Sequence, residues 1–556
     1  MHTPETILAI NDGHDANVTL ARGDDILLSA SRERFSRKKF QGGFPVEIMQ
    51  YMRSEMGVSP QAIDRIIFTN RLNFVHRFFP SHFQYYQHDY FSKAQVAYLL
   101  YQDLFRRIPG VRGLCNWAGR IKYRGYFKRK PLFIDHHLAH ALSAYYFSGI
   151  HHALIVTADN LGDGLAATVY LGKEQRVQRL KGIGCLHSPG QFYGEMTQLI
   201  GFDPLKHAGK TTGLAARGDW RKYYALMEQL FAARGNGNLH MAPVYRPFRG
   251  ARLKRQLKGA RIEDIAAAAQ KRLEDVMLAF VRHFLAATGA RALVLAGGVF
   301  ANVRLNQVLA EQTDIDAIYI HPGMTDAGLS MGAYAWYRVC RQGRLPAFLP
   351  HVYLGPAPGP LAEHPAAQRY RITQPQNLPL AIAQCLQQGK VVAVCRGAME
   401  YGPRALGNRS ILFRPDDPSV NDWLNHKLKR TEFMPFAPTL LAEDADELLF
   451  ANKATALSDR FMTITFRTRP LLQQKAPAII HLDGTVRPQV LRRQDNPFYY
   501  QVIETFKRLT GIPCVLNTSF NMHEEPIVMT ADDALRAFEQ AQLDVLVVND
   551  CLVSRK

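Results

Sequence analysis

The chain of 556 residues lacks the long apolar run of a membrane-spanning helix, which needs about 18 consecutive residues or more. Its first residues, MHTPETILAIND, lack the basic segment and the small-residue cleavage site of a secretory signal. The seven cysteines include no CxxC pair, which argues against a disulfide scaffold and a thiolate zinc site. These absences predict a globular protein of the cytoplasm, and the length predicts two domains or more.

Two segments lack acidic residues altogether. Residues 106–130 carry nine lysines and arginines, and residues 246–261 carry seven. Without these sixteen charges the net charge is +4 instead of +20, so the basicity is local. The segments are either solvated surface insertions or a surface that attracts an anionic partner. Trp117, Tyr123 and Tyr126 lie among the charges of the first segment, which suits a phosphorylated glycolipid at a membrane surface or an RNA.

Proline marks a domain boundary. The stretch 346–365, PAFLPHVYLGPAPGPLAEHP, holds six prolines, which propagate neither a helix nor a central strand. We therefore expect a first domain at 1–345, a linker at 346–365 and a second domain at 366–556.

The first half repeats a pattern of strands and polar turns. Residues 6–12 and 26–36 predict strands that flank a Gly/Asp turn, and residues 153–171 repeat the pattern. Residues 293–310 then predict a strand, a glycine pair and a helix. This order resembles the duplicated α/β fold of actin, Hsp70 and the sugar kinases. In that fold the acidic turns face phosphate and metal, and the glycine pair approaches a nucleoside.

Three histidines follow an apolar run in the stretch 131–147, PLFIDHHLAHALSAYYF. If Asp135 caps a helix, His136 and His140 share one face, whereas His137 points roughly 100° away. The pair is either a structural feature of a helix start or part of a metal site. The protease motif HExxH is absent, because position 137 is His. We expect His137 to be structural.

Two ligands make a poor metal site, so the interpretation depends on further donors. Asp159 ends the predicted strand ALIVTAD, and Asp326 lies in HPGMTDAG before another predicted helix. With His136 and His140 they give two nitrogens and two oxygens, a set that suits iron, manganese or zinc better than calcium or magnesium.

The turn INDGHDANVTL at 10–20 is a second candidate site. His14 is either a polar turn residue or a general base, since an imidazole titrates near neutral pH. Asp12 can orient it or contact an acceptor. Lys39, in RERFSRKKF, is either a cation near phosphate or an exposed surface lysine.

Several motifs together carry a resemblance that covers the chain from about residue 6 to residue 550. They are NDGHDA, RERFSRKK, DHHLAHA, HAGKTTGLA, LAGGVFAN, HPGMTDAG, GPRALGNRS, PFAP, DGTVRPQ and LNTSFN. In this order they resemble the ATP-dependent O-carbamoyltransferases of the nodulation-factor and aminoglycoside-antibiotic type. The resemblance implies an actin-like N-terminal domain, similar to the tRNA threonylcarbamoyltransferase, and a C-terminal α/β domain similar to its carbamoyl-adenylate-forming partner.

The resemblance also implies a two-step reaction. The C-terminal domain makes carbamoyl-adenylate from carbamoyl phosphate and ATP with Mg²⁺, releasing phosphate and pyrophosphate. The N-terminal domain then passes the carbamoyl group to an alcohol and releases AMP. By resemblance, ferrous iron is bound by His136, His140, Asp159 and Asp326, and His14 with Asp12 is catalytic. Nucleotide or carbamoyl contacts are implied for Lys39, Asp163, Lys210, Gly297, Gly298 and Asn302.

The second half suits adenylate formation on its own terms. Adenylate formation brings two anions together, so several fixed cations are needed. Each arginine alone is more often a surface ion pair, but the group predicts an anion site for ATP and carbamoyl phosphate. Its members are Arg404, Arg409, Lys429, Arg430, Arg487, Asn517, Ser519 and Asn521.

Three positions depart from the family pattern: Met434 replaces a cation, Ala208 replaces a glutamate, and Glu524 lies in a variant of the GEPIV motif. Three rival classes also remain open. A tRNA-modifying threonylcarbamoyl-type enzyme would explain the related domains. A non-catalytic ATP-binding module would leave the cations of the second half unexplained, and a sugar kinase would yield ADP.

The acceptor is expected to be a hydroxyl, for instance on a sugar of a glycolipid, a lipopolysaccharide or a secondary metabolite. The basic segments favour an anionic saccharide or glycolipid approached at the inner membrane face, with nucleic acid the less favoured partner.

Overall fold

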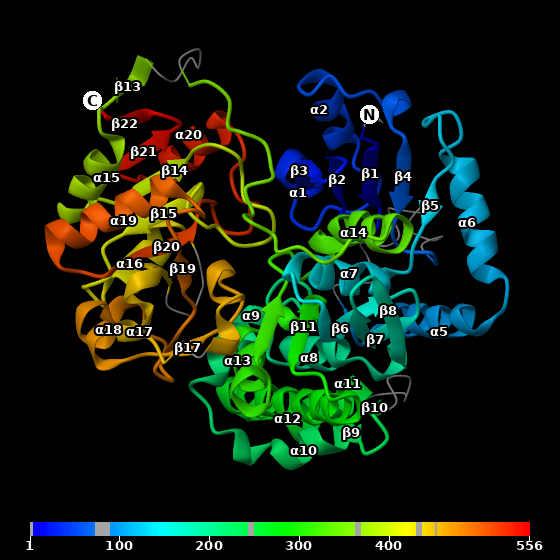
Figure 1. Cartoon of the computed structure of the whole chain (residues 1–556). Helices are drawn as coiled ribbons and strands as arrows, with labels where there is room; N and C mark the ends of the chain where they lie inside the picture. The colour runs from blue at the N-terminus through cyan, green and yellow to red at the C-terminus, as the bar shows by residue number, and fades with distance from the viewer. Residues whose placement is uncertain (1–3, 73–88, 243–248, 362–367, 430–435, 451–452) are drawn as a thin grey trace. The chain divides into compact units, whose positions relative to one another are not determined.

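The structure is a computed structural model that describes residues 4–72, 89–242, 249–361, 368–429, 436–450 and 453–556 (Figure 1). By internal contacts the chain divides into two units. The first comprises residues up to Arg32 together with Gln41–Leu349, and the second comprises Glu33–Phe40 and Pro350–Lys556. The division at Pro350 falls inside the proline-rich stretch 346–365.

The assignment of Glu33–Phe40 to the second unit has a physical basis in Arg37. Its guanidinium donates hydrogen bonds to the carbonyls of Pro526 and Ile527, both at 2.8 Å. It also forms an ion pair of 3.2 Å with Asp533. Sequence reasoning placed this segment in the N-terminal domain, because no local pattern reports contacts across almost 500 residues.

The first unit contains two five-stranded sheets with the same strand order. The order in the first sheet is β3 (Asp25–Ser31), β2 (Asn17–Arg22), β1 (Thr6–Asn11), β4 (Arg65–Phe68) and β5 (Leu132–Phe133). The order in the second is β8 (Arg176–Gly184), β7 (Leu165–Lys173), β6 (His152–Gly162), β11 (Ala292–Ala296) and β12 (Ala317–Ile320).

In both sheets the first three strands are antiparallel and the last two run parallel to the third. The repeat confirms the duplicated actin-like α/β fold. One predicted strand is too long: 26–36 ends as a strand at Ser31, and Arg32–Ser36 form the short helix α1, where the chain enters the second unit.

Helices surround these sheets, and none of the described helices is long and apolar enough to cross a membrane. The further helices of the first unit are α2 (Val46–Ser54), α5 (Lys93–Arg107), α6 (Val111–Lys122), α7 (His136–Ser148), α8 (Pro189–Leu199), α9 (Ala208–Ala215), α10 (Tyr224–Leu230), α11 (Arg249–Gln256), α12 (Ile262–Thr288), α13 (Val303–Gln312) and α14 (Leu329–Gln342). A hairpin of β9 (Phe231–Arg234) and β10 (Asn238–Met241) completes it.

The core of the first unit is the crossing of α7 and α14. Almost every residue of α7 is buried, as expected for a helix that is apolar on all sides. The two helices approach so closely at Gly332 that a Cβ there would lie 1.8 Å from the carbonyl oxygen of Ala139. This contact fixes the start of α14 against the start of α7.

The second unit is built on an eight-stranded mixed sheet. Its strand order is β13 (Tyr370–Thr373), β22 (Cys551–Arg555), β21 (Val545–Val548), β14 (Val392–Cys395), β15 (Arg409–Phe413), β20 (Cys514–Ser519), β16 (Ala437–Leu441) and β19 (Gln489–Leu491). A separate pair joins β17 (Phe466–Arg467) and β18 (Thr485–Val486). The helices are α15 (Leu378–Gln387), α16 (Val420–Lys427), α17 (Ala445–Leu448), α18 (Pro470–Lys475), α19 (Pro497–Thr510) and α20 (Ala531–Gln540). Apolar residues of α15 and α19 form one buried cluster with the sheet.

Candidate metal centre and anion site

The helix α7 begins at His136, and Asp135 occupies its N-cap position as the sequence predicted. The Asp135 side chain makes no capping hydrogen bond. It forms ion pairs instead with Arg112 at 3.3 Å and Arg71 at 3.7 Å. The helix start is therefore tied to two neighbouring segments, which fixes the position of the first histidine.

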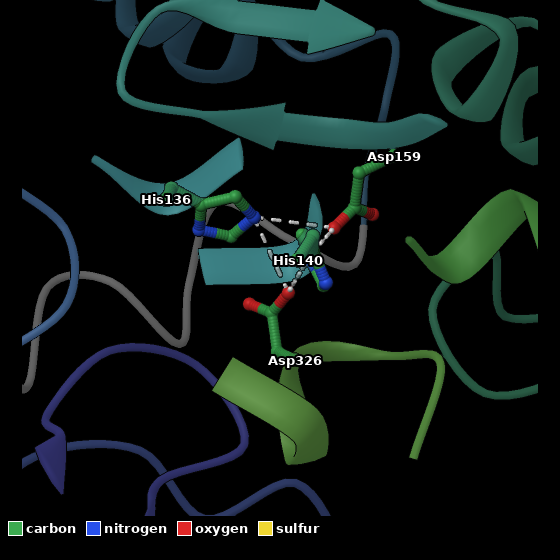
Figure 2. A group of neighbouring side chains, drawn as sticks. All are labelled: His136, His140, Asp159 and Asp326. Atoms are coloured by element: carbon green, nitrogen blue, oxygen red, sulfur yellow. Dashed lines mark hydrogen bonds and ion pairs between the residues drawn. The ribbon is translucent and has the colours of Figure 1, made fainter. Parts of the chain in front are cut away.

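Four side chains converge at this helix start, as Figure 2 shows. His136 Nε2 lies 3.4 Å from Asp159 Oδ2 and 3.5 Å from Asp326 Oδ1. His140 Nε2 lies 3.2 Å and 3.3 Å from the same two oxygens. All four ligand atoms lie within 4.8 Å of one another. The structure thus brings together the two histidines of α7, the aspartate near the end of β6 and the aspartate that precedes α14.

The donor set fits one divalent cation. Ligand atoms about 2.0–2.2 Å from a common ion lie roughly 3.0–3.5 Å apart, which is the spacing found between the imidazole nitrogens and carboxylate oxygens. Burial and the nearby Asp159 raise the pKa of Asp326 well above its usual range. The pKa of Asp159 is lowered, because hydrogen bonds with both histidines outweigh its burial. A cation between them would let both carboxylates ionise.

A second layer of residues orients His136. Its Nδ1 lies 2.6 Å from the side-chain oxygen of Asn70. Because an amide oxygen only accepts, Nδ1 carries the proton and Nε2 presents its lone pair to the cluster. Asn70 in turn donates to Asn11 Oδ1 at 2.8 Å, which also accepts from the Thr69 hydroxyl at 3.1 Å. Sequence reasoning missed these residues.

The turn between β6 and β7 carries two further constraints on His136. A Cβ at Gly162 would lie 2.0 Å from the His136 ring, so only glycine leaves room for the imidazole. The Asp163 carboxylate accepts from the backbone N–H groups of His136, Arg71 and Leu72 at 2.7–3.0 Å. The resemblance implied that Asp163 contacts the nucleotide or the carbamoyl group. In the structure its carboxylate holds the loop at residues 71–72 against the start of α7.

His137 is separate from the cluster. It is buried, and its Nδ1 lies 2.8 Å from the hydroxyl of Thr157. Burial lowers the pKa of His137 well below its usual value, and the neighbouring histidines add to this, so the ring is neutral. These features fit the structural role expected from its place on the helix.

The turn between β1 and β2 carries the two predicted catalytic residues. His14 is partly buried, and its backbone carbonyl accepts from the side chain of Asn11 at 2.9 Å. Asp12 is buried and accepts a hydrogen bond of 2.8 Å from the hydroxyl of Tyr123, at the end of α6. Asn17 donates to the carbonyl of Asp326 at 2.8 Å, which ties this turn to the metal cluster. In the sequence, the one signal for Asn11 and Asn17 is that they are polar residues in a pair of apolar strands.

The other residues of the first domain that were predicted to contact the nucleotide or the carbamoyl group lie on separate segments of the chain. Lys39 is exposed and lies in the segment that belongs to the second unit. Lys210 is buried on α9, with its ammonium 5.6 Å from the ring of Phe202. Asn302 caps α13 and shares two amide hydrogen bonds with Gln270.

The predicted glycine pair follows β11. A Cβ at Gly297 would lie 2.1 Å from the carbonyl oxygen of Ala158, and one at Gly298 would lie 3.0 Å from Asp159 Oδ1. Because both residues are glycines, the end of β11 and the end of β6 can approach each other beside Asp159. This approach is to a backbone, whereas the fold resemblance implied an approach to a nucleoside.

Two arginines of the second unit form a positive site. Burial lowers the pKa of Arg404 to about 10. Burial and the charge of Arg404 lower the pKa of Arg487 well below its usual value. Arg404 Nε has no hydrogen-bond partner, and neither guanidinium forms an ion pair with a carboxylate among the described residues. Two partly buried cations, of which Arg404 lowers the pKa of Arg487, suit an anion site.

Arg409 has a different role from the anion contact that the sequence suggested. It is fully buried, and its guanidinium donates to five backbone carbonyls at 2.9–3.3 Å. The buried Glu400 accepts three backbone N–H groups of the same loop, from Leu406, Asn408 and Arg409. These two charged residues shape the loop that carries Arg404, and Glu400 was not predicted.

The remaining predicted residues of this site lie near the same loop or outside the described residues. Asn517 is buried and donates to the carbonyl of Ala405 at 3.2 Å. The Ser519 hydroxyl donates to Asn521, which donates to backbone carbonyls of its own turn. Lys429 is exposed, with a positive φ of 54°. Arg430 and Met434 lie outside the described residues.

Comparison with known proteins covers both units. Residues 6–335 match the family described as Carbamoyltransferase N-terminus, and residues 383–555 match Carbamoyltransferase C-terminus. The chain is 30% identical to uncharacterized protein MJ1051 of Methanocaldococcus jannaschii, over 99% of each chain. It is 34% identical to nodulation protein NolO of Bradyrhizobium diazoefficiens, over 76% of this chain and 79% of that one.

Among solved structures, a similar one is full-length HypF in a phosphate- and nucleotide-bound form. The sequences are 11% identical, with a TM-score of 0.35, over 60% of this chain and 55% of that chain. This likeness is too low to bear on function.

Proposed function

The chain belongs to the carbamoyltransferase family and is a carbamoyl-transferring enzyme, and from this premise we propose that it is an ATP-dependent O-carbamoyltransferase. The first step is proposed for the second unit. Carbamoyl phosphate, ATP and one water give carbamoyl-adenylate, phosphate and pyrophosphate. The second step is proposed for the first unit, where an acceptor hydroxyl replaces AMP on the carbamoyl carbon.

The observation that carries this proposal is the convergence of two histidines and two aspartates in the first unit. A divalent cation held there supplies a Lewis acid that polarises a carbamoyl carbonyl. The two histidines are almost completely buried, whereas the side chains of Asp159 and Asp326 remain 16% and 17% exposed. The open side of the site is therefore on the carboxylates. We propose ferrous iron as the ion; the donor set also suits manganese or zinc.

The protein's own residues account for the rest of the transfer step. His14 is proposed to take the proton from the acceptor hydroxyl, since its ring is the titratable group of the β1–β2 turn best suited to neutral pH. Tyr123 fixes Asp12 of the same turn through a hydrogen bond of 2.8 Å. Asn17 keeps this turn in register with Asp326. The acceptor is proposed to be a saccharide hydroxyl.

Arg404 and Arg487 support the first step. Their guanidinium groups, close enough for the charge of Arg404 to lower the pKa of Arg487, provide the fixed positive charge that two reacting anions need. The hydrogen bonds of Arg409 and Glu400 hold the loop in place before substrates arrive, so little reorganisation is needed.

Two assays separate the steps. Pyrophosphate release that depends on carbamoyl phosphate reports the first, and mass spectrometry of a carbamoylated sugar panel reports the second. We expect His140→Ala to lose metal and transfer but to keep pyrophosphate release, and Arg404→Gln to do the reverse. His137→Gln is the matched control, because it changes a buried histidine outside the cluster. Equal loss of both steps in His140→Ala contradicts the proposal, and ATP consumption that requires threonine favours the tRNA-modifying alternative.

A further inference from the structure

The helices α5 and α6 expose an unusual number of large apolar side chains. Figure 1 shows the two helices joined by a short turn at the edge of the first unit. We define the α5–α6 face by six exposed residues, which are 41–62% accessible: Leu100, Leu104, Ile108, Leu114, Trp117 and Ile121. Most other exposed large hydrophobic residues are scattered along the chain, whereas these six fall within 22 consecutive positions. Such a concentration marks an interaction surface.

The exposed residues follow helical periodicity. Leu114, Trp117 and Ile121 are spaced i, i+3 and i+7, so they form one stripe along α6. The opposite side of α6 is packed against the protein, with Cys115 and Gly119 buried. The helix is therefore amphipathic with its apolar stripe facing solvent, the reverse of an ordinary surface helix.

Cations flank this stripe on both sides. Arg120 lies on one side of it around the helix axis and Lys122 on the other, Arg124 follows just after the helix end, and all three are exposed. Farther along, Arg124, Lys128, Arg129 and Lys130 form no ion pair with any residue that the structure describes. No acidic residue occurs between positions 106 and 130. The cations at positions 124, 128, 129 and 130 thus leave a net positive field beyond the end of α6, whereas Arg106 and Arg107 pair with Asp103 on α5.

The second basic segment contacts the chain just before α5. A Cβ at Gly250 of α11 would lie 3.0 Å from the ring of Phe91, which immediately precedes α5. On α11 and just after it, Leu253 and Leu257 are buried while the intervening Lys254 and Arg255 are exposed. The second basic segment therefore lies near the N-terminal end of α5, whereas the first begins at the C-terminal end of that helix.

We propose that the α5–α6 face docks on the anionic surface of a lipid bilayer. Leucine, isoleucine and tryptophan insert among the acyl chains and head groups, while flanking arginines and lysines contact lipid phosphates. A second copy of this chain is a poor occupant, because it would bring two cationic rims together. An RNA needs the cations but gives no reason to expose a stripe of leucine and isoleucine.

The face is attached to the candidate transfer site. Tyr123, at the end of α6, donates its hydrogen bond to Asp12. On α5, the backbone at Gln102 and the side chain of Arg106 pack against Gly164 in the β6–β7 turn, so closely that a Cβ there would lie 2.6–2.7 Å from them. Docking would bring this site to acceptor hydroxyls carried by membrane saccharides, a consequence that rests on the proposed function.

The test is cosedimentation of the full chain with vesicles of phosphatidylcholine containing 30% phosphatidylglycerol, against vesicles of phosphatidylcholine alone. We expect binding to the anionic vesicles that weakens in high salt. The double substitution Arg120→Gln with Arg124→Gln should lower the partition coefficient about 30-fold. Leu114→Ser should lower it about tenfold or more. Leu471→Ser on α18 and the pair Arg371→Gln with Lys390→Gln are matched controls, and should leave it unchanged.

Trp117 gives a second readout that does not depend on activity. It is the one exposed tryptophan among the four of the chain. We expect its emission to shift to the blue with anionic vesicles and Trp117→Phe to bind without the shift. Three results would overturn the proposal: vesicle binding insensitive to the α6 substitutions, retention of a short RNA without vesicle binding, or dimerisation abolished by Leu114→Ser without vesicle binding. Loss of carbamoyl transfer with vesicle binding intact would overturn only the proposed function.

Discussion

The hydrogen bond between Asn70 and His136 gives a sharp test of the metal centre. The substitution Asn70→Gly removes the acceptor of the 2.6 Å bond while keeping the backbone unstrained, because Asn70 has a positive φ of 64° that glycine adopts freely. The change leaves the buried His136 N–H without an acceptor and lets the ring change tautomer or rotate. The substitution leaves the residue types at all four cluster positions unchanged.

The expected loss follows from the burial of both groups. A buried donor left unsatisfied costs about 1–3 kcal/mol, which corresponds to a factor of about 5 to 150 in an equilibrium constant. Outer-layer partners of metal-bound histidines contribute about 10- to 100-fold in affinity. We therefore expect Asn70→Gly to weaken metal binding by about 10- to 100-fold, measured by equilibrium dialysis with Mn²⁺ as the probe.

The matched control is Thr157→Val, which removes the hydroxyl that contacts His137 at 2.8 Å. It changes the partner of a buried histidine on the same helix, but this histidine is not a ligand. We expect it to leave metal affinity unchanged while lowering stability by about 1 kcal/mol. If both variants weaken metal binding equally, or if Asn70→Gly binds as tightly as the parent, the assigned orienting role is refuted.

Three further predictions follow from other contacts. Gly162→Ala places a Cβ 2.0 Å from the His136 ring, so we expect bound metal, measured by mass spectrometry, to fall at least tenfold. Arg409→Lys loses most of five carbonyl contacts, so the unfolding free energy should fall by about 3 kcal/mol, whereas Arg404→Lys should be neutral in the same denaturant titration. Burial lowers the pKa of His321 to about 3, so the neutral ring favours the folded state at pH 7, and this stability is lost as the pH falls below about 6.5. Between pH 7 and pH 5 the loss is about 2 kcal/mol, and His321→Phe should remove it from the unfolding titration.

Sequence reasoning brought together the four residues of the candidate metal cluster because their signals are local. Helical spacing separated His136 and His140 from His137, and a strand end or a turn before a helix marked each aspartate. The orienting residues gave no such signal. Asn70 meets His136 across 66 positions, and Asn17 meets Asp326 across 309. Their partners are set by packing of distant elements, which no short pattern contains.

The arginines of the second unit show a different limit. Arg404 and Arg409 lie in the same motif, GPRALGNRS, and look equivalent as anion ligands. In the fold Arg409 starts the buried strand β15 and its two terminal guanidinium nitrogens donate to backbone carbonyls, whereas Arg404 lies near a second cation. Charge and spacing alone could not separate a guanidinium that holds backbone carbonyls from the one that we propose for the anion site.

The repeated topology of the first unit explains why two distant polar turns serve one site. The turn between β1 and β2 and the turn between β6 and β7 occupy equivalent places in the two sheets. The first carries His14, and the second lies next to Asp159. Close packing of α14 on α7 then sets Asp326 opposite the histidines. Because the ligands are fixed by core packing instead of by flexible loops, the geometry is formed before an ion binds, and the energy of binding is not spent on folding the site.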